Sequence, residues 1–184
     1  MSADLYDEND IQNTITDDII TNLKKLSFVT ITEDDIVEYI HWQCQKVLQF
    51  AKDKNSSKEV ARAINLNTFE VLGTVMGEKR SVDIDYLVRQ MQDTEYVFMV
   101  IHNHPSDMPF SLLDIKTFIN SDNMTILVVL GNNGSIYILE KTKQLSLSGV
   151  LSVRKTLIDW KNKVIDFTDV IDQIKTLGIV YSEM

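Results

Sequence analysis

The segment EYVFMVIH, residues 95–102, constrains the fold of this chain more than any other feature. It is an almost continuous apolar run, and it is far shorter than the roughly 20 residues that a membrane-spanning helix requires. A run of this length without polar alternation is typical of a strand whose two faces are both buried. The sequence therefore predicts a sheet with other elements packed against both of its faces.

Patterns typical of helices and strands surround this run. Apolar residues at helical spacing predict helices over residues 16–26, 32–54, 82–94 and 111–123 and again from residue 146, with Thr16 and Thr32 as N-caps of the first two. β-branched and alternating segments predict further strands over residues 59–66, 70–77, 124–130 and 135–141, the last two joined by the turn GNNG. This order predicts an α+β fold, a mixed β-sheet flanked by helices, with helical N- and C-terminal extensions.

The same patterns divide the chain into three regions. We expect residues 1–54 to form an acidic helical extension, residues 55–145 a core, and residues 146–184 C-terminal helices that pack on this core. Residues 1–38 carry ten acidic residues and two lysines, which leaves only one of the nine net negative charges to the rest of the chain. Because no basic stripe is present, no nucleic-acid partner is expected.

Cysteine usage and the first residues indicate the compartment. The single cysteine, Cys44, excludes an intramolecular disulfide and a cysteine-rich zinc site, and it fits a reducing compartment. The N-terminus is acidic and polar, unlike a signal peptide. With hydrophobic residues at 44% of the chain, a proper core can form. The sequence therefore predicts a cytoplasmic protein without a membrane partner, and it does not indicate an oligomeric state.

Two histidines end the buried strand. His102 and His104 are two residues apart, so their side chains point to the same side of the sheet. Pro105 stops the strand, and Asp114 lies in the first turn of the helix that follows. Three nitrogen and oxygen donors of this kind suit zinc and leave a fourth position open for water, which is the arrangement of a catalytic zinc site. His102, His104 and Asp114 are therefore candidate metal ligands.

Each part of this pattern also has a simpler interpretation. Ser111 and Asp114 form a Ser-x-x-Asp sequence before an apolar run, which is typical of a helix N-cap. A His-x-His pair alone is a weak signal, because surface histidine pairs are common. The combination is more specific, and the two interpretations are compatible, since Ser111 can cap the helix while Asp114 faces a metal.

The stretch HNHPSDMPFSLLD, residues 102–114, resembles the JAMM signature of the JAB/MPN metalloproteases, and residues 57–140 resemble bacterial and phage-type JAB domains. The resemblance implies a JAB/MPN-like (cytidine-deaminase-like) sheet and a Zn²⁺ cofactor bound by His102, His104 and Asp114. It further implies that Ser111 stabilises the oxyanion and that a glutamate on an earlier strand is the catalytic acid and base.

Four glutamates precede the histidines: Glu59, Glu70, Glu78 and Glu95. The resemblance places the catalytic glutamate on the early hairpin strand, which favours Glu59 at the start of KEVARAINLN, with Glu70 as second choice. Glu78 lies in an expected turn, where a solvated charge is the default. Glu95 lies at the far end of the histidine strand. For the metal ligand, Asp107 is too close to His104 in sequence, which favours Asp114.

The resemblance implies a zinc-dependent metallopeptidase or isopeptidase that acts on a protein or peptide substrate, with a ubiquitin-like tail as one candidate. The spacer between His104 and Ser111 is six residues, one shorter than in many relatives. The chain also lacks a long insertion after Asp114 and a cysteine cluster, so linkage-selective cleavage of ubiquitin chains is not supported. Two alternatives stay open, a RadC-like non-peptidase with a role linked to DNA and a catalytically silent JAB binding module.

Overall fold

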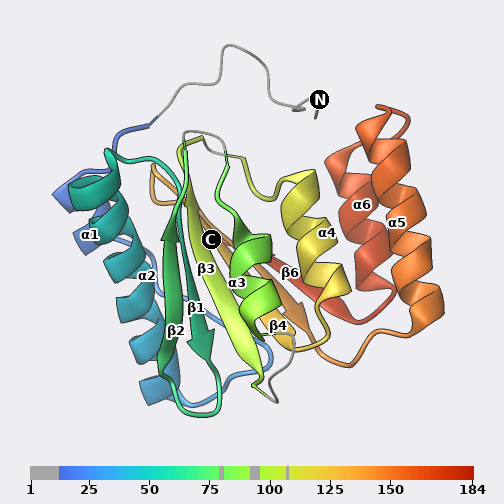
Figure 1. The fold of residues 1–184 in the computed structure, drawn as a ribbon, viewed down its shortest axis with the longest axis horizontal. Helices are drawn as coiled ribbons and strands as arrows, with labels where there is room; N and C mark the ends of the chain where they lie inside the picture. Colours follow the sequence, from blue (N-terminus) through green and yellow to red (C-terminus); the bar gives the residue numbers. More distant parts are fainter. Residues whose placement is uncertain (1–12, 79–80, 92–95, 107) are drawn as a thin grey trace.

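The computed structural model describes residues 13–78, 81–91, 96–106 and 108–184. In these ranges the fold is α+β, with a six-stranded mixed sheet between two layers of helices (Figure 1). The helices are α1 (Asp17–Thr21), α2 (Asp34–Asn55), α3 (Ile84–Met91), α4 (Leu112–Asn120), α5 (Leu147–Lys161) and α6 (Phe167–Lys175). The strands are β1 (Val60–Asn65), β2 (Val71–Met76), β3 (Phe98–His104), β4 (Met124–Gly131), β5 (Ile136–Lys141) and β6 (Ile179–Glu183).

Residues 98–102 of the apolar run form most of β3, an interior strand of the sheet. The strand order is β2-β1-β3-β4-β5-β6, and only β3 and β4 run parallel. All seven residues of β3 are buried. Met99 and Ile101 pack in the core beneath α1 and α2, whereas Phe98 and Val100 pack in the core beneath α3–α6. The prediction of a strand buried on both faces is confirmed.

The N-terminal helices supply one whole layer of the fold. On α2, Ile40, Cys44, Val47 and Ala51 are fully buried, as the helical spacing predicts. The side chain of Thr16 caps α1 by accepting a hydrogen bond from the amide of Ile19, which confirms that prediction. Among the described residues, no helix combines the length and the apolar character needed to cross a lipid bilayer.

The predicted N-cap of α2 is wrong by one residue. Glu33, rather than Thr32, occupies the N-cap position, and its side chain makes no capping hydrogen bond. Its carboxylate instead accepts a hydrogen bond from the amide of Thr32 at 3.1 Å. Asp34 and Asp35 in the first turn favour the helix start through its dipole, so a capping side chain is not required.

The end of the chain also differs from the prediction of helices alone over residues 146–184. After α6, Gly178 takes a left-handed conformation with a φ of 84°, and the chain then enters β6. β6 pairs antiparallel with β5, which gives β5 a second neighbour in the sheet. The C-terminal region therefore contributes a strand as well as two helices, and the region boundaries at residues 54/55 and 145/146 stay a prediction.

A buried carboxylate ties the segment between α1 and α2 to the sheet. Glu140 on β5 is fully buried and accepts hydrogen bonds from the amides of Val29 and Thr30 and from the Thr30 hydroxyl, at 2.7–3.0 Å. These donors join a connecting loop to the strand on which the α1–α2 layer rests. Glu140 thus anchors the polar end of a loop whose Leu26 and Phe28 are buried in the core beside it.

Replacing Glu140 with leucine should therefore lower the free energy of unfolding by about 2–3 kcal/mol, because the two amides and the hydroxyl lose their acceptor. Chemical denaturation measures the change. Thr30→Val removes only the hydroxyl bond and should cost about 1 kcal/mol. A Glu140→Leu protein as stable as the parent would contradict this account of the loop.

Candidate metal centre

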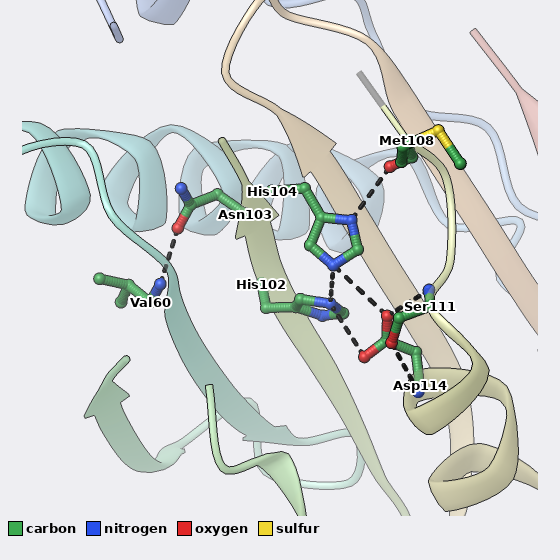
Figure 2. A network of polar contacts seen from close by, with 7 residues as sticks. All are labelled: Val60, His102, Asn103, His104, Met108, Ser111 and Asp114. Carbon is green, nitrogen blue, oxygen red and sulfur yellow. Dashed lines mark hydrogen bonds and ion pairs between the residues drawn. The ribbon is translucent and has the colours of Figure 1, made fainter. Parts of the chain in front are cut away.

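The two histidines of β3 lie on the face of the sheet that α3 and α4 cover. His102 is fully buried and His104 nearly so. Their Nε2 atoms are 3.0 Å apart, and Figure 2 shows both rings turned toward the first turn of α4. The Nδ1 atom of His104 is 3.0 Å from the carbonyl oxygen of Met108, which favours the tautomer with a proton on Nδ1 and a lone pair on Nε2.

The N-terminus of α4 brings Asp114 to these rings. Ser111 is the N-cap: its Oγ accepts a hydrogen bond from the Asp114 amide at 3.1 Å, and its own amide donates to Asp114 Oδ2 at 2.7 Å. The same carboxylate lies beside both histidines, with Oδ1 3.4 Å from His102 Nε2 and Oδ2 3.3 Å from His104 Nε2. Asp114 therefore caps the helix and faces the histidines at the same time.

These three side chains can hold a metal ion. Their donor atoms all lie within 4.8 Å of one another, and all three residues are buried. Two ligand atoms bound tetrahedrally to one zinc-sized ion at about 2.0–2.1 Å would be about 3.4 Å apart. Each histidine has one Asp114 oxygen at this spacing, Oδ1 for His102 and Oδ2 for His104, and the histidine pair is slightly closer. The residues therefore fit a bound divalent ion in number, chemistry and spacing.

The far end of α4 is fixed as well. Lys141 on β5 donates hydrogen bonds from Nζ to the carbonyl oxygens of Phe118, at 2.7 Å, and Ser121. A cation at a helix C-terminus complements the helix dipole. Burial lowers the pKa of Lys141 to about 8. Because α4 is held by a capping box at one end and by this lysine at the other, the fold itself directs Asp114 at the histidines.

The electrostatics of the site follow from burying one carboxylate against two imidazoles. Burial raises the pKa of Asp114, but the charges and hydrogen bonds of the histidines outweigh it and hold the pKa well below its usual range. Burial lowers the pKa of His104, but the hydrogen bond and charge of Asp114 and the charge of Glu59 raise it to about 9. Burial dominates at His102 and lowers its pKa. Without a metal, the site therefore favours a proton on His104.

Glu59 lies beside this cluster. Ala61 on β1 pairs with His102 on β3 in antiparallel register, so two residues further along the strands Glu59 comes level with His104, on the same face. The Glu59 side chain is only 7% exposed. Burial has the largest effect and raises the pKa of Glu59 to about 7. The charge of His104 and a hydrogen bond from the backbone of Val82 lower this pKa, whereas the charge of Asp114 raises it. Of the candidate glutamates that the structure describes, this is the one whose pKa responds to the charges of the candidate metal ligands.

The other candidates lie elsewhere. Glu70 directly precedes β2 at the opposite end of β1, about 20 Å along the strand from Glu59, and its exposed carboxylate accepts a hydrogen bond from Thr68. Glu78 is exposed and forms an ion pair with Lys58 at 2.7 Å, in line with the solvated charge expected for it. Glu95 lies outside the described residues, and so does Asp107, the rejected alternative to Asp114.

Two neighbours of the site, Asn103 and Met108, were not among the residues predicted to take part in it. Asn103 points to the opposite face from the histidines and is fully buried (Figure 2). Met108 contributes only a backbone carbonyl, so its residue type carries no information about its contact with His104. An asparagine between two histidines that end a buried strand is the one available hint, because a buried amide requires hydrogen-bond partners.

Metal affinity should rise with pH. His104 must lose its proton before Nε2 can bind a metal, and its pKa of about 9 in the metal-free protein lies above neutral pH. The apparent affinity for Co²⁺ or Zn²⁺ should therefore increase about tenfold for each pH unit between pH 6 and 8. Competition titration with a chelator measures it, with His104→Ala as the variant that loses the site. A pH-independent affinity would contradict the protonated His104.

The free energy of unfolding of the metal-free protein should depend on pH through the Glu59 carboxyl group. Its folded pKa of about 7 lies above the ordinary value of 4.5, so its stabilising contribution is full below pH 4.5 and is lost as the pH rises through 7. Glu59→Gln should therefore gain up to about 3 kcal/mol relative to the parent between pH 4.5 and pH 8, as measured by urea denaturation. Glu70→Gln makes the same change at an exposed carboxylate and is the matched control.

Comparison of the chain with protein-family models, with curated proteins and with solved structures gave no match.

Proposed function

We propose that this chain is a zinc-dependent metallopeptidase of the JAB/MPN type that hydrolyses a peptide or isopeptide bond. The observation that carries the proposal is the buried Glu59 carboxylate beside His104 and Asp114, because a general base must combine proximity to the reacting atoms with a pKa near neutrality. The mixed sheet with a helix layer on each face supports a JAB/MPN-like fold as part of this proposal.

The donor set favours zinc among the common divalent ions. Two imidazoles and one carboxylate are typical of a catalytic zinc site with three protein ligands and an open fourth position. When bound there, zinc supplies a Lewis acid and lowers the pKa of water to about 7. His102, His104 and Asp114 would hold the ion, and the hydrogen bond from His104 to Met108 would fix the ring that binds it.

Glu59 then transfers the proton, and Ser111 stabilises the negative charge that develops on the substrate oxygen. Glu59, with a pKa of about 7, takes a proton from the attacking water and returns it to the leaving amine. The Ser111 oxygen uses a lone pair to cap α4, so its hydroxyl proton stays available to donate to the oxygen on which negative charge develops. Capping fixes the position of this hydroxyl before a substrate arrives.

An extended peptide is the substrate form that fits the sheet. β2 forms one edge of the sheet and lies next to β1, at whose start Glu59 stands. Met76, at the end of β2 that is level with Val60, is 60% exposed. A substrate tail can pair with such an edge by β-augmentation and run toward the metal ligands. The tail of a ubiquitin-like protein has this extended form.

The test is hydrolysis by the zinc-loaded protein of ubiquitin-like proteins with C-terminal extensions and of a peptide library, with products identified by mass spectrometry. Glu59→Gln should lower turnover by about 10²- to 10⁴-fold with zinc still bound, because it removes the base but no ligand. Ser111→Ala should lower turnover about 100-fold through loss of one donor. Glu70→Gln should leave turnover unchanged.

Hydrolysis that continues equally in Glu59→Gln, Glu70→Gln and His104→Ala would exclude the proposed mechanism. Stoichiometric zinc without hydrolysis of any substrate in the panel would favour a catalytically silent binding module instead.

A further inference from the structure

Asn103, between the two candidate histidine ligands, makes three hydrogen bonds on the face of β3 away from the metal site. Its Oδ1 accepts from the Val60 amide at 2.8 Å, and its Nδ2 donates to the Lys58 carbonyl at 3.3 Å and to Asn132 Oδ1 at 2.8 Å. Figure 2 shows the side chain directed at Val60 and away from both imidazoles. A fully buried carboxamide is thus satisfied mainly by the start of β1.

Two of these partners belong to the peptide groups on either side of Glu59. The Lys58 carbonyl lies in the peptide bond before Glu59, and the Val60 amide lies in the peptide bond after it. The same two peptide groups also bond to Glu78, Gly77 and Asn55, so Asn103 completes the set of contacts on the β3 side. Together these bonds fix the φ and ψ angles of Glu59, and these angles set the direction in which its side chain leaves the backbone. The paired residues of β1 and β3 extend only as far as Ala61 and His102, so the Asn103 side chain continues the contact where that pairing ends.

Asn132 bonds to the backbone of the segment just before Glu59. It receives the hydrogen bond of Asn103, and its own Nδ2 donates to the carbonyl oxygens of Ser57 and Asn13, both at 2.8 Å. Ser56 and Ser57 have φ angles of 52° and 60°, which is unfavourable for residues with a side chain. Such a conformation persists only where its surroundings fix it. The two asparagines therefore contribute to holding residues 56–60 in one path, beside the backbone bonds of this segment to α2 and to the end of β2.

We propose that Asn103 is a positioning residue for Glu59, a role that rests on the proposed function of Glu59 as the general base. The carboxamide holds the Glu59 backbone so that the carboxylate projects toward the metal ligands. Asn103 touches neither the metal site nor a substrate, and it acts only through Glu59.

The candidate metal ligands are held by other contacts. His102 and His104 are placed by the pairing of β3 with β4, opposite Val129 and Gly131, and Asp114 is placed by the capping box of α4. A change at Asn103 that leaves β3 in the sheet should therefore separate two quantities. Turnover should fall because the base is displaced, whereas metal affinity should stay the same.

The experiment compares Asn103→Leu and Asn103→Asp with the parent. Leucine has a similar size and makes none of the three bonds; aspartate keeps an acceptor for Val60 but presents a second acceptor to Asn132. In both variants kcat should fall about 10- to 100-fold with KM and Zn²⁺ affinity changed less than about threefold, because a displacement of about 1 Å at a reacting group costs about this much. Asn67→Asp makes the same chemical change at an exposed turn residue and should alter none of these quantities.

A double-mutant cycle separates positioning from a general structural effect. If Asn103 acts through Glu59, Asn103→Leu should cause no further loss of turnover once Glu59 is glutamine. Additive losses in the double variant would overturn the inference, and so would a fall in zinc affinity as large as the fall in kcat. Asn103→Ser, which is smaller and cannot reach both peptide groups, replaces the leucine variant if leucine lowers the folded fraction.

If the parent protein hydrolyses no substrate in the panel, hydrogen exchange and NMR can still test the positioning role of Asn103. In the metal-free protein, Asn103→Leu should speed hydrogen exchange at the Val60 amide and move the carboxyl ¹³C signal of Glu59, while the affinity for Zn²⁺ stays at the parent value. An unmoved Glu59 signal would overturn the positioning role. A moved signal in a protein without hydrolysis would keep the positioning role and reject the proposed function.

Discussion

The carboxylate of Asp114 joins the start of α4 to the end of β3, and the site depends on this connection. Oδ2 accepts a hydrogen bond from the Ser111 amide and lies beside His104, and Oδ1 lies beside His102. A carboxylate buried without partners would be costly, so the helix start and the strand end stabilise the same charge. Lys141 holds the other end of the helix, which leaves α4 little freedom to withdraw Asp114 from the histidines.

Local signals explain why much of the fold could be predicted from the sequence. The apolar run that became β3, the GNNG turn and the Ser-x-x-Asp cap of α4 each encode their structure within a few residues. β6 could not be predicted in this way, because a five-residue strand is specified mainly by its pairing with β5, far upstream. At α2, two adjacent polar residues, Thr32 and Glu33, could both begin the helix, and residue types alone do not locate a helix end to within one residue.

Some residues of the site could be identified from the sequence, whereas others could be identified only from the structure. Two histidines on one strand and an aspartate in the next helix turn can be placed on one side from periodicity alone. The choice of Glu59 over Glu70 by position requires the register of β1 on β3, because the two residues lie at opposite ends of one hairpin. The part that Asn103 plays was not predictable, because its partners are backbone groups, and these have no signature in the sequence.

The candidate ligands lie on β3 and α4, and Glu59 directly precedes β1, so the site exists only when these separate parts of the chain have come together. A metal ion bound there would interact with the folded chain and only weakly with the unfolded one, and mass action would then shift the folding equilibrium toward the folded state. Separation of α4 from β3 would release the ion, because the three candidate ligands lie on these two elements. The metal content of a sample would thus record the fraction of molecules in which the start of α4 is packed against the end of β3.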